Sequence, residues 1–229
     1  MKYRYLLFDL DGTIFDYDRA EAHALEETFT QFNLVFKKDH LTLYRDINKQ
    51  IWADYENGII SQNDLSLERF GRLSSSLKID FDASFFSSVY LKNLSKGRYL
   101  IPGAVELLEL LFSREFKLYL ITNGLKDVQR ERLSGSPVTP FFKDIFISEE
   151  MGAAKPDRKI FDESFNRMGS PEKSEVLIIG DSLSSDIAGG FSYGIDTCWI
   201  NPEKLLNNSN YFPTFVLESV NGLREILKT

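Results

Sequence analysis

A short apolar run near the start of the chain ends in two carboxylates, and this feature most constrains the fold. Residues 5–8, Tyr-Leu-Leu-Phe, have the length and composition of a strand buried on both faces. Asp9 and Asp11 follow, and on an extended chain side chains two residues apart point to the same side. Two such carboxylates at the edge of an apolar core are costly unless a cation or a chemical task accompanies them. A plain turn at Gly12 explains the same residues, so the rest of the chain must decide.

The composition is that of a soluble globular protein and disfavours several functional classes. The 229 residues are 43% hydrophobic and carry a net charge of −7, which argues against non-specific binding to a nucleic-acid polymer. No run reaches the roughly 18 apolar residues of a membrane helix, and the run after Met1 is too short for a signal peptide. The single cysteine, Cys198, excludes an internal disulfide. We therefore expect a cytoplasmic protein without a membrane partner, and nothing in the sequence requires more than a monomer.

The remaining chain changes its pattern twice. Helical periodicity dominates residues 16–97, whereas apolar runs alternate with helical segments from residue 98 onward. The expected helices of the first segment lie at about residues 18–32, 39–55, 61–77 and 82–94. The expected strands of the second lie at residues 116–121, 144–147, 175–179 and 197–200, with a last helix near residues 217–227. The sequence thus predicts an α/β protein with a doubly wound parallel-sheet core, residues 1–15 and 98–229, interrupted by a helical bundle, residues 16–97.

Polar side chains follow the carboxyl ends of these predicted strands, where ligands bind to open parallel sheets. Thr122 and Asn123 follow the second strand, and Lys155 precedes Pro156 in the segment after the third. Asp181 and Asp186 follow the fourth strand. Each alone has an ordinary explanation, such as a turn, a solvated lysine or a helix N-cap. Their occurrence at equivalent ends of one sheet favours a common site.

The charges of this set predict its chemistry. The aspartates would bring together up to four negative charges, which Lys155 alone offsets, and this imbalance implies a bound cation. An all-oxygen ligand set suits Mg²⁺. Thr122 and Asn123 add neutral donors, and Lys155 a point charge, of the kind that hold a phosphate. A carboxylate nucleophile, a second carboxylate, a metal and phosphate donors together indicate phosphoryl transfer through an aspartyl-phosphate.

The same residues resemble the motifs of the haloacid dehalogenase (HAD) superfamily, and of its phosphatase branch in particular. Residues 8–13, Phe-Asp-Leu-Asp-Gly-Thr, match the first motif, and residues 180–186 match the fourth, Gly-Asp-x-x-x-x-Asp. Thr122 with Asn123 resembles the second motif, and Lys155 before Pro156 resembles the third. All four occur in order, and the layout covers nearly the whole chain. The helical insertion resembles the family's α-helical cap of the first class, on a Rossmann-like HAD core.

The resemblance implies catalytic roles for the first two aspartates. Asp9 would be the nucleophile that forms the phosphoaspartate. Asp11 would protonate the leaving oxygen and then activate the water that cleaves the intermediate, two tasks that require different protonation states. The dehalogenases of this superfamily lack an aspartate two residues after the nucleophile, so Asp11 indicates a phosphatase or a phosphomutase.

The resemblance also implies phosphate and metal ligands. Thr122 and Asn123 would hold the phosphate, and Lys155 would neutralise charge between the nucleophile and the phosphate. The implied ligands of Mg²⁺ are Asp9, the backbone carbonyl of Asp11, and Asp181. Asp186 is either a ligand through water or a partner of Lys155.

The second motif and the length of the insertion are similar to those of bacterial pyrimidine 5′-nucleotidases of the house-cleaning kind. The expected partner is therefore a small phosphomonoester, and a nucleoside 5′-monophosphate is the leading substrate. Phosphoglycolate or a sugar phosphate is the alternative within the same chemistry, and a β-phosphoglucomutase-like mutase is the next. Substrate choice is expected to depend on residues 16–24 and on Arg45, Lys49 and Trp52, although a solvated helix face and core packing explain these residues as well.

Two non-enzymatic alternatives fit less well. A receiver domain of a phosphorelay protein carries its phosphorylated aspartate at the end of the third strand, whereas this chain has Ile-Ser-Glu at residues 147–149. A catalytically silent HAD member would have lost catalytic residues, and all the expected ones are present.

Overall fold

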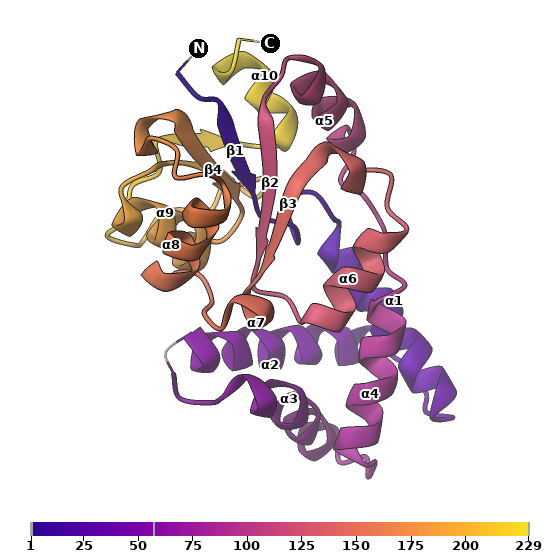
Figure 1. Ribbon diagram of the computed structural model, residues 1–229. Coiled ribbons are helices and arrows are strands. Elements are labelled where there is room, and N and C mark those ends of the chain that lie inside the picture. The colour runs from indigo at the N-terminus through magenta and orange to yellow at the C-terminus, as the bar shows by residue number, and fades with distance from the viewer. Residues whose placement is uncertain (1, 57, 229) are drawn as a thin grey trace. The chain divides into compact units, whose positions relative to one another are not determined.

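The computed structural model describes residues 2–56 and 58–228 (Figure 1), and the chain divides into two compact units. The first combines Met1–Tyr17 with Arg98–Thr229, and the second is Asp18–Gly97. The second unit contains the helical insertion that the sequence predicts for residues 16–97, and its role as a cap stays a prediction. No helix in the described ranges is long and apolar enough to cross a membrane.

A six-stranded parallel sheet forms the centre of the first unit, with the strand order β3-β2-β1-β4-β5-β6. The chain winds outward from β1 first to one edge and then to the other, which is the doubly wound order of Rossmann-like folds. The predicted fold class is therefore confirmed. The strands are β1 (Tyr5–Phe8), β2 (Lys117–Thr122), β3 (Phe142–Ile147), β4 (Val176–Gly180), β5 (Asp196–Ile200) and β6 (Phe215–Leu217).

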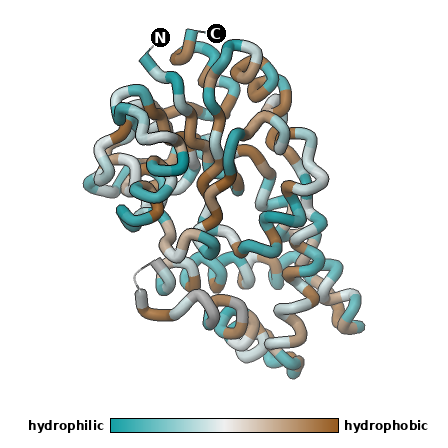
Figure 2. Tube along the Cα trace, in the orientation of Figure 1, coloured by the Kyte–Doolittle hydropathy of each residue, from teal (hydrophilic) through white to brown (hydrophobic). Residues whose placement is uncertain are grey.

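Two apolar cores lie on opposite faces of this sheet. Successive residues of a strand point to opposite faces, so Leu6 and Phe8 of β1 join one core and Leu7 joins the other. Figure 2 shows the central strands as largely hydrophobic, as expected for strands covered on both faces. The helices that contribute to the first core include α5 (Ala104–Ser113), α6 (Lys126–Ser134) and α10 (Leu223–Ile226), and those of the second include α8 (Arg158–Arg167) and α9 (Ala188–Tyr193).

The C-terminal part differs from the sequence-based expectation. The predicted helix over residues 217–227 is wrong in its first part, because Phe215–Leu217 forms the edge strand β6. The carbonyl of Leu217 accepts a hydrogen bond of 2.7 Å from the backbone N–H of Asn201, just beyond β5. Only α10 and a preceding helical turn, Val220–Gly222, remain helical. A short apolar run is compatible with either a helix or a strand. Here it forms a strand because it pairs with the edge of β5. The sequence also missed the four-residue helix α7 (Ser148–Met151).

The described residues of the second unit form four helices, the first of which begins one residue earlier, at Tyr17. The N-caps of the last two are polar: the Asp64 carboxylate accepts from Ser61 N–H before α3, and Asp82 accepts from the backbone N–H of Phe85 in α4. Their buried faces share a core of aromatic side chains, including those of Phe70 and Phe86. The helices are α1 (Tyr17–Gln31), α2 (Lys38–Glu56), α3 (Gln62–Leu77) and α4 (Ala83–Leu94).

Candidate active site

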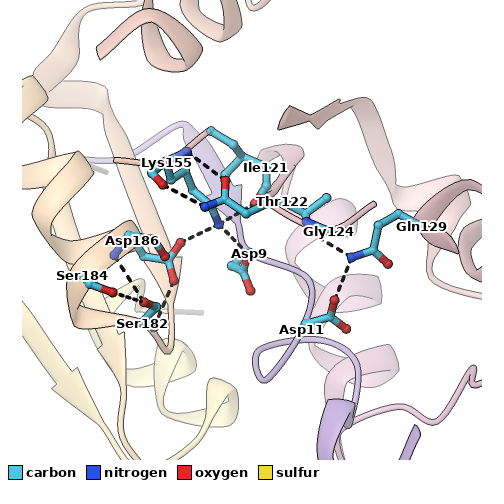
Figure 3. A network of polar contacts seen from close by, with 12 residues as sticks. Asp9, Asp11, Ile121, Thr122, Gly124, Gln129, Lys155, Ser182, Ser184 and Asp186 are labelled. Carbon is cyan, nitrogen blue, oxygen red and sulfur yellow. Dashed lines mark hydrogen bonds and ion pairs between the residues drawn. The ribbon is translucent and has the colours of Figure 1, made fainter. Parts of the chain in front are cut away.

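Three strands end at one edge of the sheet and bring the residues that follow them together. In the register of the sheet, Phe8 of β1 lies beside Leu120 of β2 and Ile179 of β4. The backbone N–H of Asp9 donates to the carbonyl of Ile179 over 2.8 Å, which fixes the start of the loop after β1. In open parallel sheets this carboxyl edge, near the point where the strand order reverses, is where ligands bind. Figure 3 shows the polar side chains that gather there.

A tight turn carries the chain away from β1. The backbone N–H groups of Ile14 and Phe15 donate to the carbonyl of Leu10, at 2.9 and 2.8 Å. Gly12 has a φ of 79°, in the left-handed region that favours glycine. A Cβ atom at this position would lie 2.3 Å from Oδ2 of Asp181, closer than any real contact. Glycine is therefore required both by the turn and by the close approach of this carboxylate.

Lys155 is the central cation of the site. Its Nζ donates to Oδ1 of Asp9 at 2.5 Å, to Oδ1 of Asp186 at 2.7 Å and to the carbonyl of Ile121 at 2.9 Å. All three donor positions of the ammonium group are thus used. Burial alone would lower the pKa of Lys155, but the carboxylates of Asp186 and Asp9 raise it above its usual value. The lysine therefore remains charged at neutral pH and holds the two aspartates on one side of the site.

The side chain of Asn123 positions the backbone of Lys155. Its Nδ2 donates to the Lys155 carbonyl at 2.8 Å, and its Oδ1 accepts from the Lys155 backbone N–H at 2.8 Å. This pair of bonds ties the segment after α7 to the loop at the end of β2, so the lysine reaches Asp9 from a fixed backbone. The family resemblance implies that this amide binds the phosphate. In this structure it holds the lysine loop, and its part in phosphate binding stays a prediction.

Three carboxylates converge within reach of one cation. Single oxygen atoms of Asp9, Asp181 and Asp186 lie within 4.8 Å of one another. Burial, followed by the charges of Asp186 and Asp181, raises the pKa of Asp9 well above its usual value. Although Asp181 as a residue is exposed, its carboxyl group packs against Gly12, and this burial together with Asp186 raises its pKa to about 7. The single charge of Lys155 does not balance this group, so the residues fit a divalent cation with oxygen ligands.

Asp186 is fully buried and accepts hydrogen bonds at both oxygens. Oδ1 accepts from Lys155, and Oδ2 accepts from the backbone N–H of Ser182 at 3.1 Å. A Cβ atom at position 180 would lie 2.1 Å from its Oδ2, so Gly180 provides the space for this carboxylate. Of the two roles that the sequence left open, partnership with Lys155 is the one seen in the structure. A contact with a metal through water stays a prediction.

Asp11 faces a different set of partners. Figure 3 shows it turned toward Gln129, whereas Asp9 faces Lys155. Its Oδ2 accepts from Nε2 of Gln129 at 2.7 Å, and its Oδ1 accepts from Nη1 of Arg132 at 2.5 Å. Sequence reasoning missed both of these residues of α6. Gln129 and Arg132 are three residues apart, which places them on one face of the helix, and each stands next to a buried apolar residue, Val128 or Leu133. This spacing is a signal that the sequence does contain.

The second unit holds its own polar cluster. Arg45 donates from Nε to Oε2 of Glu21 at 2.9 Å, and Nδ2 of Asn48 donates to Oε1 of the same glutamate at 3.1 Å. Burial raises the pKa of Glu21, and Arg45 opposes that rise. The ring of Trp52 packs against that of Tyr55, with centroids 5.9 Å apart. Lys49 is exposed. These contacts give Arg45 and Trp52 structural partners, and the predicted part of all three residues in substrate choice stays a prediction.

Comparison with known proteins agrees with this geometry. The family model described as haloacid dehalogenase-like hydrolase matches residues 6–200. The chain is 38% identical to the HAD-hydrolase YfnB of Bacillus subtilis over 226 residues, which cover 99% of this chain and 96% of that protein. A crystal structure of YfnB bound to magnesium has a TM-score of 0.93 to this structure, with 37% identity and 100% of both chains covered.

Two further relatives carry enzyme names. The pyrimidine 5′-nucleotidase PynA of Streptococcus pneumoniae is 37% identical over 227 residues, which cover 99% of this chain and 96% of that protein. The pyrimidine 5′-nucleotidase YjjG of Escherichia coli is 32% identical over 227 residues, which cover 99% of both chains. Because the family model spans residues 6–200, which include all three strand ends of the site, the chain is an enzyme and belongs to the haloacid dehalogenase-like hydrolases.

Proposed function

We propose that the chain is a Mg²⁺-dependent phosphatase that hydrolyses phosphomonoesters through a phosphoaspartate formed on Asp9. One observation carries the proposal. Asp9 lies at the carboxyl edge of the sheet with one oxygen on Lys155 and with Asp181 and Asp186 close enough to share a cation. A carboxylate oriented by a buried cation beside a metal site is the arrangement that phosphoryl transfer to a side chain requires.

In the first step, an oxygen of Asp9 attacks the phosphorus of the substrate. A bond forms between that oxygen and phosphorus while the ester P–O bond breaks. The leaving oxygen takes the bonding electron pair and accepts a proton from the carboxyl group of Asp11. The alcohol departs, and the phosphoryl group stays on Asp9.

In the second step, water attacks the phosphorus of the phosphoaspartate, and the carboxylate of Asp11 takes the proton of that water. The bond between phosphorus and the Asp9 oxygen breaks, which restores the Asp9 carboxylate and releases inorganic phosphate. Asp11 ends this step protonated and ready for the next leaving group. The same residue thus acts first as acid and then as base.

Thr122 and Lys155 would hold the phosphate through both steps. Oγ1 of Thr122 accepts two hydrogen bonds of 3.1 Å, from the backbone N–H of Gly124 and from Nε2 of Gln129. Because both lone pairs of the hydroxyl oxygen are used, the hydroxyl can bind a further partner only by donating its hydrogen. A phosphate oxygen is such an acceptor. Lys155 adds a buried positive charge beside the nucleophile.

Asp9, Asp181 and the backbone carbonyl of Asp11 are the groups that we expect to hold Mg²⁺. When bound, the ion neutralises negative charge on the phosphoryl oxygens. Asp186 would support the site by keeping Lys155 in place, because its Oδ1 lies 2.7 Å from the lysine Nζ. The acid-rich, oxygen-only donor set supports magnesium rather than zinc, which prefers nitrogen and sulfur ligands.

The leading substrate is a nucleoside 5′-monophosphate with a pyrimidine base. The support is the identity of 37% and 32% to two full-length relatives named pyrimidine 5′-nucleotidase. We propose that the helical unit, Asp18–Gly97, acts as the family's cap and selects the leaving group. Its insertion into the chain directly after the loop of Asp11 supports that role.

The nucleophile can be tested with p-nitrophenyl phosphate. We expect Asp9→Asn to lower the Mg²⁺-dependent rate by about 10⁴-fold or more, because the amide cannot form the phosphoaspartate. Asp144→Asn is the matched control, since Asp144 pairs with Arg167 at the surface, with 2.6 Å between Nη2 and Oδ1. Full activity of Asp9→Asn, or full activity of the native enzyme in EDTA, would contradict the mechanism.

The substrate needs a separate measurement. We expect kcat/KM for uridine and deoxyuridine 5′-monophosphates to exceed those for purine nucleotides, phosphoglycolate and a sugar phosphate by at least about 10-fold. A panel with equal rates for all of these would remove the nucleotidase assignment and leave the phosphatase chemistry intact. A preference for phosphoglycolate or the sugar phosphate would favour the alternative substrates.

A further inference from the structure

Helix α6 turns two buried polar side chains toward the site. Gln129 is 1% exposed and Arg132 is fully buried, although both lie on a helix that is otherwise strongly polar at its surface. Burying an amide and a guanidinium is costly unless their hydrogen bonds are satisfied. The neighbouring helix residues Arg130 and Glu131 face solvent instead. The two buried side chains therefore need an explanation that helix stability does not supply.

Their partners are the two residues to which we assign proton transfer and phosphate binding. Nε2 of Gln129 donates to Oδ2 of Asp11 at 2.7 Å and to Oγ1 of Thr122 at 3.1 Å (Figure 3). Nη1 of Arg132 donates to Oδ1 of Asp11 at 2.5 Å. One amide nitrogen thus lies within hydrogen-bond distance of both the acid–base carboxylate and the phosphate-binding hydroxyl. This contact sets the position of one relative to the other.

The orientation of the Gln129 amide is fixed on its other side. Its Oε1 accepts from Nη1 of Arg132 at 3.0 Å, so the NH₂ group must face Asp11 and Thr122. Arg132 in turn lies over the ring of Phe15, with 4.7 Å between Cζ and the ring centroid. Because the guanidinium can only donate hydrogen bonds, it must face the oxygen of the Gln129 amide. The amide nitrogen then faces Asp11 and Thr122.

The loop after β2 is built around the same amide. A Cβ atom at position 124 would lie 2.0 Å from Nε2 of Gln129. Gly124, the glycine of the Thr-Asn-Gly sequence, therefore leaves the space that the glutamine fills. The side chain of Gln129 fits closely against the turn at Gly124, five residues earlier. This fit favours a role for Gln129 at the site over a chance contact.

We propose that Gln129 and Arg132 are positioning residues of the phosphatase reaction. They hold the Asp11 carboxylate within reach of a phosphate bound at Thr122, and they fix the Thr122 hydroxyl as a donor toward that phosphate. The inference rests on the proposed function, in which Asp11 transfers protons. Without these two side chains, Asp11 is free to take other rotamers and protonates the leaving oxygen less often.

The test compares leaving groups, since only a basic leaving oxygen depends on a well-placed acid. We expect Gln129→Met to lower kcat/KM for phenyl phosphate by about 10- to 100-fold and to lower that for p-nitrophenyl phosphate clearly less. Arg132→Lys keeps the buried charge but loses the guanidinium fork, and we expect the same pattern. Arg130→Met is the control on the same helix, because Arg130 pairs with Glu150 at the surface, and it should leave both rates unchanged.

A double-mutant cycle separates positioning from stability. In an Asp11→Asn background, Gln129→Met should lower the phenyl phosphate rate by a clearly smaller factor than in the native background, because the carboxylate that it positions is already lost and only its contact with Thr122 remains. Thermal unfolding of each variant shows whether it is folded at the assay temperature. If Gln129→Met and Arg132→Lys keep the native ratio of the two rates, or if the effects of Gln129→Met and Asp11→Asn multiply, the inference is wrong. Native phenyl phosphate activity of Asp11→Asn alone would instead contradict the proposed role of Asp11.

Discussion

At the scale of single residues, glycine decides where the polar side chains of the site can lie. A Cβ atom would collide with the Asp181 carboxylate at position 12, with Gln129 at position 124 and with Asp186 at position 180. Gly12 and Gly124 lie in the loops after β1 and β2, and Gly180 is the last residue of β4. These glycines therefore do more than permit turns, because each leaves the space that a side chain of the candidate site occupies.

Gly12→Ala tests this at the proposed metal site. The new Cβ would displace the carboxylate of Asp181, from which it would lie 2.3 Å, so we expect weaker Mg²⁺ binding and at least about 10-fold lower activity at limiting Mg²⁺. Isothermal titration with Mg²⁺ measures the affinity. The strained φ of 79° should in addition cost about 1–2 kcal/mol of stability.

Gly169→Ala is the matched control for that backbone cost. Gly169 has a φ of 84°, and a Cβ atom there meets nothing within 4 Å. We expect it to lose similar stability while it retains native Mg²⁺ affinity. Equal Mg²⁺ affinities of the two variants would show that Asp181 does not depend on the space at Gly12.

At the scale of elements, α4 shows how one helix divides its side chains between core and solvent. Phe86 is fully buried, and its ring lies 4.2–5.6 Å, centroid to centroid, from the rings of four other phenylalanines. Its neighbour Phe85 is 62% exposed and approaches only the ring of Phe32, at 5.3 Å, among the described ring pairs. Adjacent residues of identical chemistry thus have different energetic roles.

Phe86→Ala and Phe85→Ala form a matched pair on this helix. We expect Phe86→Ala to lower the free energy of unfolding of the helical unit by about 3–5 kcal/mol, because it leaves a cavity among the aromatic rings. Phe85→Ala should cost about 1 kcal/mol or less. Urea denaturation followed by circular dichroism measures both, and equal losses would contradict the assigned burial.

The elements also show where sequence patterns suffice and where they fail. The strand at Tyr5–Phe8 and the helices of residues 18–94 were predictable, because apolar runs and helical periodicity are patterns among neighbours in sequence. The edge strand Phe215–Leu217 was not, since its pairing partner is β5. A three-residue run has too little periodicity to identify itself without that partner.

At the scale of the whole molecule, the sheet shields the only cysteine. Cys198 lies in β5 and is fully buried, and burial raises the pKa of its thiol to about 12. Because the thiolate is the reactive form, a pKa of about 12 leaves about one thiol in 10⁴ ionised at pH 8. The shift favours the neutral thiol in the folded protein, so the reactive fraction grows only as the pH approaches 12.

We therefore expect Ellman's reagent to label the native enzyme very slowly at pH 8. Labelling should become fast and reach one thiol per chain when urea unfolds the core, and its onset should coincide with the loss of circular dichroism. Rapid stoichiometric labelling in native buffer would show that the sheet opens around β5 or that the thiol is accessible.

The doubly wound class, the family resemblance and the candidate residues at the strand ends, from Asp9 to Asp186, could be predicted from the sequence, and the roles of these residues stay predictions. The prediction was possible because strand periodicity and residues at strand ends are local patterns, and parallel strands bring such ends to one edge. The contacts that these residues make could not be predicted in this way, because they depend on the tertiary structure. In the folded chain, Asp186 pairs with Lys155, and the Asn123 amide binds the backbone of Lys155. Asp11 accepts hydrogen bonds from Gln129 and Arg132. These contacts depend on distances between side chains from different elements, which the packing of the sheet and helices sets. The spacing of Gln129 and Arg132 in the sequence places both on one helix face but does not identify Asp11 as their partner.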